Sequence, residues 1–298
     1  MATRILLVLL LLTGVANAQA PQQLKIGIFA PSVEFDTAQA RLAYVQGLAK
    51  AIEQNTGIRV QAYAYSTLGA LKKDNLDFAI VESVCYATNG SWQVLANAKI
   101  DNSTSRQWAL FASGADSMLA LRGKKLAYMQ TGCNDAGFID NAMLDSEVDK
   151  NFFGARQAAN DLRGAIASVS SYKTAQAVFA PTSSSAKSLT KLFDTGVVPN
   201  PAFVQIDSKL PDSVSSKVAA AVIGYGGGGA ISGWARGERG PYSALAGQLR
   251  PVQKTGVFAG PESVRLQSND VLIDPPTIKD YDLVSVRQHF QRPAARLE

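Results

Sequence analysis

The sequence predicts an α/β protein of two lobes, each a mixed, mostly parallel sheet flanked by helices. Strand-like and helix-like segments alternate over residues 24–81, a second alternation begins near Gly123, and the Gly- and Pro-containing stretch 194–201 indicates a connection between lobes. Such alternation is typical of parallel sheets covered by helices. The 298 residues, of which 47% are hydrophobic and 18% charged, suit a folded chain of about two domains.

Five segments of the first series have the length and periodicity of regular elements: a strand at 24–29, a helix between Thr37 and Gly57, a strand at 58–65, a short helix at 68–73 and a strand at 76–81. The long helix is predicted because apolar residues recur every three or four positions from Leu42 to Ile52. Asp36 or Thr37 is its expected N-cap, and Gly57 is its expected stop. This order predicts three parallel strands.

The rest of the chain contains a second set of segments: a strand at 125–129, helices at 138–144 and 160–168, a strand at 175–179 and a helix at 210–223. The Ser-rich stretch 181–187 and the Gly-rich stretch 224–229 predict loops. We therefore expect five regions: a signal at 1–20, the first part of lobe 1 at 21–108, lobe 2 at 109–198, a return to lobe 1 at 199–250, and an irregular tail at 251–298.

Residues 1–20 have the features of a secretory signal peptide. Arg4 precedes the apolar run 5–12, and small residues at Ala16 and Ala18 offer a cleavage site. No later segment reaches the ~18 uninterrupted apolar residues of a membrane span. We expect an exported protein without stable membrane insertion.

Residue types needed for catalysis or nucleic-acid binding are scarce. The 29 Lys and Arg against 24 Asp and Glu give a net charge of +5, but they form no basic cluster with aromatics, which argues against nucleic-acid binding. A single histidine, His289, is too little for a His-rich metal site. The glycines of 224–229 follow a helix-like segment, unlike a dinucleotide-binding motif, and Asp77 and Glu82 form no more than a chance carboxylate pair. We expect that the protein is not an enzyme.

The two cysteines, Cys85 and Cys133, both lie in the exported part of the chain. An even number of cysteines in an exported protein favours a disulfide. Closing a loop of about 48 residues would contribute about 4 kcal/mol in the chain-entropy model. The alternative is that both thiols face a ligand.

Three stretches resemble a known family. The strand at 26–29 runs into a Pro-containing loop, and residues 70–86 follow without a gap the family pattern of Ala-Leu, Asp-x-Ala and a final Tyr. Residues 123–128 match the strand that opens the family's second lobe, and 133–135 occupy its ligand-binding turn. From Leu24 to Leu249 the chain resembles the phosphate/phosphite/phosphonate-binding family of ABC-transporter periplasmic solute-binding proteins, which have the type II periplasmic binding protein fold.

The resemblance implies a periplasmic monomer that closes two lobes on a small-molecule or ion ligand and delivers it to an ABC permease, without a cofactor. In such folds the strand-end loops and helix N-termini of both lobes face a common crevice. The family's ligand-binding positions correspond here to Ser32, Glu34, Phe35, Tyr65, Glu82, Ser83, Cys85, Tyr86, Cys133, Asn134, Asp135 and Gly137.

Four of these positions depart from the family pattern. Glu82 and Asp135 place negative charge where the family binds an anion with uncharged donors, so we expect a different solute, cationic or zwitterionic. Cys85 and Cys133 replace the two crevice serines and, where the lobes meet, form either a disulfide latch or a site for a thiophilic metal such as Cu(I), with Met129 nearby. The alternative function is a receptor-like, redox or metal-binding periplasmic protein that acts with a sensor domain or an assembly partner.

Overall fold

The computed structural model describes residues 23–146, 148 and 151–251, so the expected signal peptide and all of the expected tail except Pro251 lie outside it. The first lobe contains β1 (Gln23–Phe29), α1 (Ala38–Thr56), β2 (Arg59–Ala64), α2 (Leu68–Lys73), β3 (Phe78–Val81), α3 (Ser83–Asn89), β4 (Gln93–Lys99), β10 (Ala202–Gln205), α6 (Asp212–Gly224) and β11 (Gly233–Arg236). The second contains β5 (Ser105–Ala112), η1 (Leu119–Leu121), β6 (Lys125–Met129), α4 (Asp135–Gly137), η2 (Phe138–Met143), β7 (Ala155–Ala159), α5 (Leu162–Ser170), β8 (Ala177–Pro181), η3 (Ser185–Ser188) and β9 (Thr190–Pro199). Helix α7 (Gly240–Gln248) follows the return to the first lobe.

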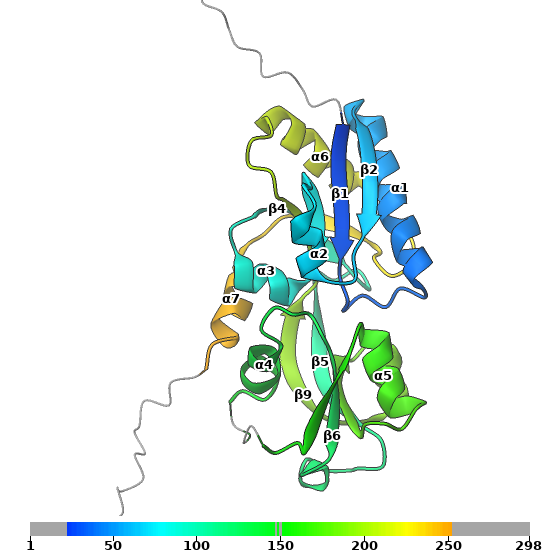
Figure 1. Ribbon diagram of the computed structural model, residues 1–298, viewed down its shortest axis with the longest axis vertical. Helices are drawn as coiled ribbons and strands as arrows, with labels where there is room; N and C mark the ends of the chain where they lie inside the picture. Colours follow the sequence, from blue (N-terminus) through cyan, green and yellow to red (C-terminus); the bar gives the residue numbers. More distant parts are fainter. Residues whose placement is uncertain (1–22, 147, 149–150, 252–298) are drawn as a thin grey trace, which may run out of the picture. The chain divides into compact units, whose positions relative to one another are not determined.

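Each lobe is built on one mixed sheet (Figure 1). The six-stranded sheet has the order β11-β4-β10-β3-β1-β2, and the five-stranded sheet has the order β7-β6-β8-β5-β9. The neighbours β2-β1-β3 and β7-β6-β8 are parallel, and the remaining pairs are antiparallel. The predicted α/β fold with two lobes is confirmed.

Helix α1 shows how the local sequence sets the limits of an element. The Thr37 hydroxyl accepts a hydrogen bond from the backbone N–H three residues later at 3.0 Å, which caps the N-terminus. Gly57 ends the helix with a φ of 73°, a left-handed conformation that glycine adopts at little cost. Between the caps, Leu48 and Ile52 are fully buried. The predicted helix is confirmed, with Thr37 as its cap.

The predicted connection at 194–201 is only partly a connection, because the chain passes from the second sheet to the first at residues 200–201 alone. Residues 190–199 form β9, the edge strand of the second sheet. Gly196, with a φ of 126°, lies at a register shift opposite Trp108, and Pro199 falls at the strand end, where a missing N–H costs little. An edge strand therefore tolerates both residues, and the chain changes sheets in short stretches between Lys99 and Ser105 and after Pro199.

The hydrophobic core is continuous from one lobe to the other. One buried cluster contains Phe29 and Val84 of the first lobe together with Trp108, Met129 and Phe138 of the second. A separate cluster, formed with helices α1 and α6, belongs to the first lobe alone. Since burial of apolar surface contributes roughly 25 cal/mol per Å², the shared cluster stabilises the closed arrangement of the lobes.

Helix α7 packs against α3 of the first lobe and against η2 and β9 of the second. The buried Tyr242 packs edge-on against Tyr86, with ring centroids 5.0 Å apart, and its hydroxyl donates to the Asn200 carbonyl at 2.9 Å. The side-chain amide of Asn141 donates to the Leu249 carbonyl, just after α7, at 2.9 Å. Helix α7 is therefore fastened to both lobes.

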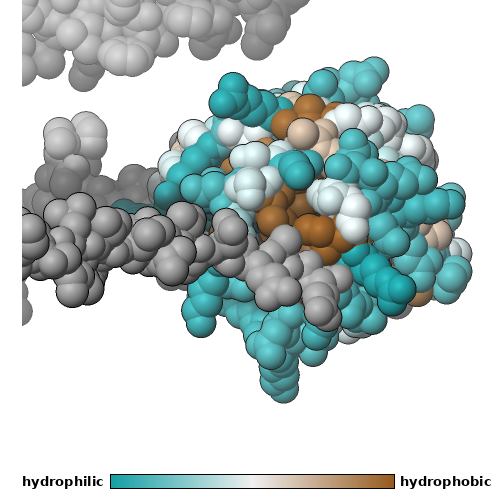
Figure 2. Space-filling model, turned by 90° about the horizontal axis from the view of Figure 1, so that it is seen from above, coloured by the Kyte–Doolittle hydropathy of each residue, from teal (hydrophilic) through white to brown (hydrophobic). Residues whose placement is uncertain are grey.

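The end face of the first lobe, seen in Figure 2, is mostly hydrophilic, with a few hydrophobic residues near its centre. Within the described ranges, no helix has the length and apolar character needed to cross a membrane. The large apolar side chains that are exposed in these ranges are Leu119, Tyr172, Val197 and Ile223, three of them in the second lobe.

Candidate ligand-binding site between the lobes

The carboxyl ends of parallel strands from the two lobes meet at the lobe interface. In the first sheet β1 lies between β2 and β3, and in the second β6 lies between β7 and β8. Where the connections after two neighbouring parallel strands run in opposite directions, a crevice forms at the carboxyl ends of these strands. Open α/β sheets bind ligands in such crevices. The loop 30–35, the start of α3 at 82–86 and the turn 130–135 therefore form the candidate site, and we refer to them as the strand-end loops.

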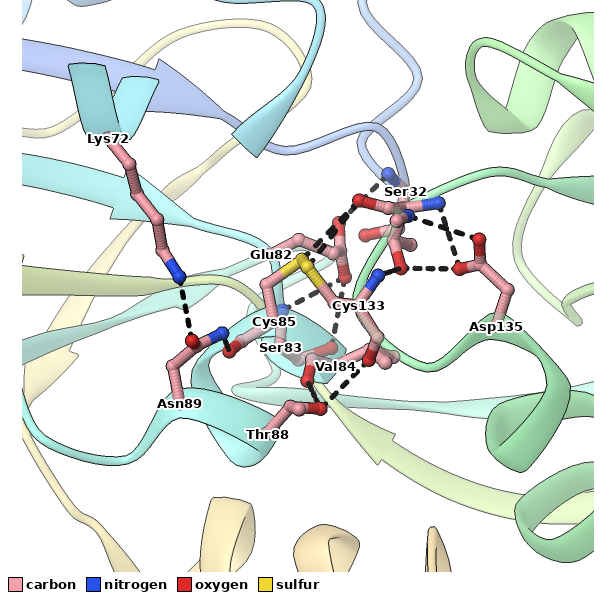
Figure 3. Close-up of a disulfide and its surroundings, with 12 residues drawn as sticks. Ser32, Lys72, Glu82, Ser83, Val84, Cys85, Thr88, Asn89, Cys133 and Asp135 are labelled. Carbon is pink, nitrogen blue, oxygen red and sulfur yellow. Dashed lines mark hydrogen bonds between the residues drawn. A yellow bond between two sulfur atoms is a disulfide. The ribbon is translucent and has the colours of Figure 1, made fainter. Parts of the chain in front are cut away.

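A disulfide joins the lobes at this point (Figure 3). The Cα atoms of Cys85 on α3 and Cys133 in the turn after β6 are 4.9 Å apart, and 48 positions separate them in sequence. The Thr88 hydroxyl of α3 donates to the Cys133 carbonyl at 2.8 Å. The predicted disulfide is confirmed. The Cu(I) site expected at Cys85 and Cys133 is not supported, because both sulfurs are in the S–S bond and no group of three His, Cys, Asp or Glu that could hold a metal is found in the described ranges.

Glu82 is a buried carboxylate directly after β3, with 1% of its surface exposed. One oxygen accepts hydrogen bonds from the backbone N–H and the hydroxyl of Ser83, each at 3.0 Å, and the other accepts the N–H of Ser32 at 3.0 Å. A buried carboxylate is tolerated when its oxygens are hydrogen-bonded in this way. An anionic ligand at this position would need the N–H groups of Ser32 and Ser83. Both already donate to Glu82.

Arg106, on β5 of the second lobe, supplies a buried positive charge. Its Nε donates to Asn200 Oδ1 at 2.7 Å, and its Nη1 and Nη2 donate to the carbonyl and hydroxyl of Ser32, each at 3.2 Å. Burial lowers the pKa of the guanidinium, and the negative charges of Glu82 and then Glu34 oppose this shift. Ser32 thus links the two charges, because its N–H donates to Glu82 while its oxygens accept from Arg106.

Asp135, like Glu82, accepts backbone N–H groups, and it does so within the turn after β6. Its carboxylate accepts hydrogen bonds from the N–H groups of Thr131 and Gly132 at 2.9 and 3.0 Å, and from the Thr131 hydroxyl. That hydroxyl in turn accepts the N–H of Cys133 at 3.1 Å. The donors of this turn are therefore directed to a carboxylate of the chain itself.

Polar contacts also join the lobes near these loops. Glu34 of the first lobe accepts hydrogen bonds from the N–H and hydroxyl of Ser185 at the start of η3. Arg163 of the second lobe and Asp36 of the first form an ion pair at 2.9 Å. Both side chains of this pair are largely exposed, so it contributes little to stability.

The expected open crevice is closed in this structure. The group Ser32, Glu82, Ser83, Cys85 and Cys133 is brought together as predicted, but none of these residues is more than 4% exposed. A cavity of about 170 Å³ remains between the lobes, lined by Phe29, Ser66, Thr67, Leu68, Gly69, Gln130, Thr131, Gly132 and Asn160. This cavity lies away from Glu82, at the ends of β2 and β7. A second cavity of about 130 Å³ has charged residues of both lobes in its lining, namely Asp36, Arg41, Asp161 and Arg163.

The other predicted residues make their contacts outside this network: Phe35 with Tyr44, Tyr65 with Asp74, Tyr86 with Trp92 and Tyr242, and Asn134 with Gly137. Burial raises the pKa of the Tyr65 and Tyr86 hydroxyls. Asn134 adopts a left-handed φ of 84° and accepts the Gly137 N–H, and a Cβ at Gly137 would lie 2.4 Å from the Asn134 amide. These residues shape the loops.

Three members of the network were not predicted from the sequence: Arg106, Thr131 and Asn200. Arg106 stands two positions before the apolar run 108–112, and Asn200 lies between two prolines. A single charge beside an apolar strand is a weak signal of a buried cation. Arg106 is buried because β5 lies between β8 and β9, an arrangement that only the tertiary structure reveals.

Asp77 and Glu82 flank β3 at opposite ends and form no acid–base pair. The Asp77 carboxylate accepts the Lys25 N–H at 2.7 Å, and burial raises its pKa. A carboxyl whose pKa is higher in the folded chain stabilises folding below its unfolded pKa of about 3.9, and this contribution is lost as pH rises through the raised value. We expect Asp77→Asn to remove this part of the pH dependence of the free energy of unfolding, measured by urea denaturation between about pH 3 and 7. An unchanged slope in the variant would contradict this assignment.

Neither a protein-family model nor a curated protein sequence matches the chain. Among solved structures, the binding protein component of an ABC phosphonate transporter from Pseudomonas aeruginosa has a TM-score of 0.57 at 15% identity, covering 76% of this chain and 85% of that one. PhnD1 from Prochlorococcus marinus, in complex with methylphosphonate, has a TM-score of 0.58 at 10% identity, covering 75% and 96%. A Xanthomonas citri protein bound to a chloride ion has a TM-score of 0.58 at 10% identity, covering 77% and 98%.

At these identities the likeness concerns the fold. The chain has the two-lobed type II periplasmic binding protein fold, in agreement with the fold that the sequence predicted.

Proposed function

We propose that the protein is a relative of the phosphonate-binding family and acts as the periplasmic solute-binding component of an ABC transport system. The observation that carries this proposal is the meeting of the strand-end loops of β1, β3 and β6 across the lobe interface. A solute held by both lobes stabilises the closed form, which a permease then recognises. In this role the protein is a monomer that is exported by means of the segment 1–20 and closes its lobes on a solute without catalysis.

A small uncharged or zwitterionic solute suits the space between the lobes better than a phosphonate. The cavity of about 170 Å³ is lined by hydroxyls and amides, from Ser66, Thr67, Gln130 and Asn160, and by no charged side chain among the described residues. The N–H donors that would hold an anion already bind Glu82 and Asp135. A solute in this cavity therefore has only neutral donors and acceptors available.

Methylphosphonate is not expected to bind. A phosphonate at the anion-binding position of the resembled family, about 4 Å from Glu82 or Asp135, would be opposed by about 4 kcal/mol per unit charge at an effective dielectric constant of 20. That opposition corresponds to about a thousandfold loss of affinity. Titration calorimetry of the oxidised protein is the measurement, with the methylphosphonate-binding Prochlorococcus protein as the positive control. Micromolar binding would contradict the assigned roles of Glu82 and Asp135.

Native mass spectrometry of freshly purified protein tests the transport role. The expected result is a bound molecule of small mass that is retained while the disulfide is intact and lost when a reductant opens the bond. The Cys85→Ala/Cys133→Ala variant is the matched control and should retain less of this mass. Absence of any bound molecule, before and after reduction, would contradict solute binding.

The disulfide specifically favours a second candidate, a receptor-like protein that displays a fixed closed shape to a sensor or assembly partner. A covalent bond across the interface opposes the opening that solute exchange requires. Photocrosslinkers at Leu119 and Tyr172, which are 70% and 72% exposed, test this candidate in living cells. We expect one protein adduct that disappears in the cysteine-free variant. An adduct of equal yield in that variant would contradict a role for the latch.

A further inference from the structure

A cavity of about 820 Å³ lies between the second lobe and helix α7. It lies among η2, β9 and α7, and none of its lining residues belongs to the strand-end loops at the lobe interface. Pockets that bind small molecules typically have volumes of about 300–1,000 Å³, with apolar walls and a few polar groups. Its size and position distinguish it from the candidate site described above.

An irregular turn of the chain forms one wall of this cavity. η2 is a π-helix, and the Leu144 N–H bonds to the Ile139 carbonyl five residues earlier at 3.1 Å. Asp145 and Ser146 follow with left-handed φ values of 50° and 55°. π-helical turns and residues with strained backbone angles are frequent at functional sites. The surrounding structure must compensate for the free energy that they cost. Residues 141–145, at the end of this π-helix and just after it, all line the cavity.

Small residues of α7 leave the opposite wall unfilled. Three residues of α7 line the cavity: Ala244 and Gly247, whose small size leaves space, and Gln248, which supplies a polar side chain. The position of α7 is nevertheless fixed, because the Leu249 carbonyl accepts from the Asn141 amide at 2.9 Å and Tyr242 is buried on the face toward Tyr86. The cavity is therefore held open by ordered elements on both sides.

The lining combines apolar side chains with negative charge. Met118, Met143 and Phe193 supply apolar surface, Asp145 and Asp194 supply carboxylates, and no Lys, Arg or His is among the described lining residues. Lys191 pairs with Asp194 at 3.1 Å, but no salt bridge to Asp145 forms among the described residues. One carboxylate therefore remains to pair with a ligand cation beside thioether and aromatic groups, which accommodate apolar ligands.

We propose that this cavity is a second ligand site, which binds a small amphipathic cation with an apolar body and one ammonium group. The apolar body contacts Met118, Met143 and Phe193, and the ammonium group pairs with Asp145. This site does not depend on the function proposed for the lobe interface, because it lies within the second lobe and α7.

Titration calorimetry of the oxidised full chain with three matched probes tests this site. The probes are 4-phenylbutylamine, 4-phenylbutanol and 4-phenylbutyrate, which share one apolar body and differ in charge. Because Asp145 is exposed to solvent, we expect the amine to bind about two- to fivefold more tightly than the alcohol, and the carboxylate to bind more weakly than the alcohol. Equal binding of the amine and the carboxylate, or no binding of the amine, would overturn the proposal.

Two variants locate the binding. Ala244→Trp fills the cavity and should abolish amine binding, whereas Ala220→Trp, on an exposed position of α6, is the matched control and should not change it. Asp145→Asn keeps a residue that tolerates the left-handed conformation and should remove the preference of the amine over the alcohol. Amine binding that survives Ala244→Trp, or a preference unchanged by Asp145→Asn, would place the ligand elsewhere and refute the site.

Discussion

Removal of the Cys85–Cys133 disulfide is expected to lower the free energy of unfolding by about 4 kcal/mol. The bond closes a loop with 48 positions between its ends, so it restricts the unfolded chain far more than the folded one. In the folded chain both cysteines are already held by α3 and by the turn after β6. Urea denaturation of oxidised wild-type protein and of Cys85→Ala/Cys133→Ala measures the difference.

Reduced wild-type protein is the control that separates the covalent bond from the lost side chains. It keeps both sulfur atoms and should lose nearly as much stability as the double variant. A reductant should have no effect on the variant itself. The slope of the free energy against urea should increase when the bond is absent, because the unfolded chain then exposes more surface. A double variant as stable as the oxidised protein would refute the assigned contribution.

Opening of the bond should also release the lobe interface locally. The N–H groups of Ser32, Ser83 and Thr131 bond to carboxylates within it. Hydrogen exchange at these groups reports how often the interface opens. We expect faster exchange there in the reduced protein, and no change in β1 away from the interface. Equal exchange in both redox states would show that the remaining contacts keep the lobes closed without the bond.

The elements that the sequence predicted well are those whose signal is local. Helix α1 has a capping threonine, an apolar stripe and a terminal glycine, and each acts within a few residues. Helix α2 begins after the same kind of cap at Thr67, and its predicted limits of 68–73 are those observed. The disulfide was predictable because export was expected from the sequence, and two cysteines can pair in one way only.

The closure of the crevice could not be predicted, because it depends on partners that are distant in sequence. The sequence identified Glu82 and Asp135 as negative charges where the phosphonate-binding pattern has uncharged donors. Their hydrogen-bond partners, however, include Ser32, which is 50 positions from Glu82. Arg106 donates to Ser32, from which it is 74 positions away in the sequence. No periodicity or capping pattern reports such a pairing, so the sequence predicted an open site where the structure has a filled one.

Replacement of Arg106 by Met is expected to cost about 3–5 kcal/mol of stability, because it breaks a buried charge network and leaves the other charge without compensation. Arg106 is 8% exposed and makes three hydrogen bonds, to Asn200 and to both oxygens of Ser32. Methionine has a similar length but no donors, so all three acceptors lose their partner. Arg106→Lys restores the charge but not the fork of donors, and should recover only part of the loss.

A double-mutant cycle distinguishes this network from simple packing. Glu82→Gln should destabilise the wild-type protein, because the carboxylate is lost while Arg106 stays charged and buried. In the Arg106→Met background the same change removes an uncompensated negative charge and should cost less or stabilise. We expect a coupling of about 1–3 kcal/mol between the two positions in urea denaturation of the oxidised protein. If the two changes are additive, the buried charges act independently. The closed interface would then be held by the disulfide and the shared hydrophobic cluster, without help from a charge pair bridged by Ser32.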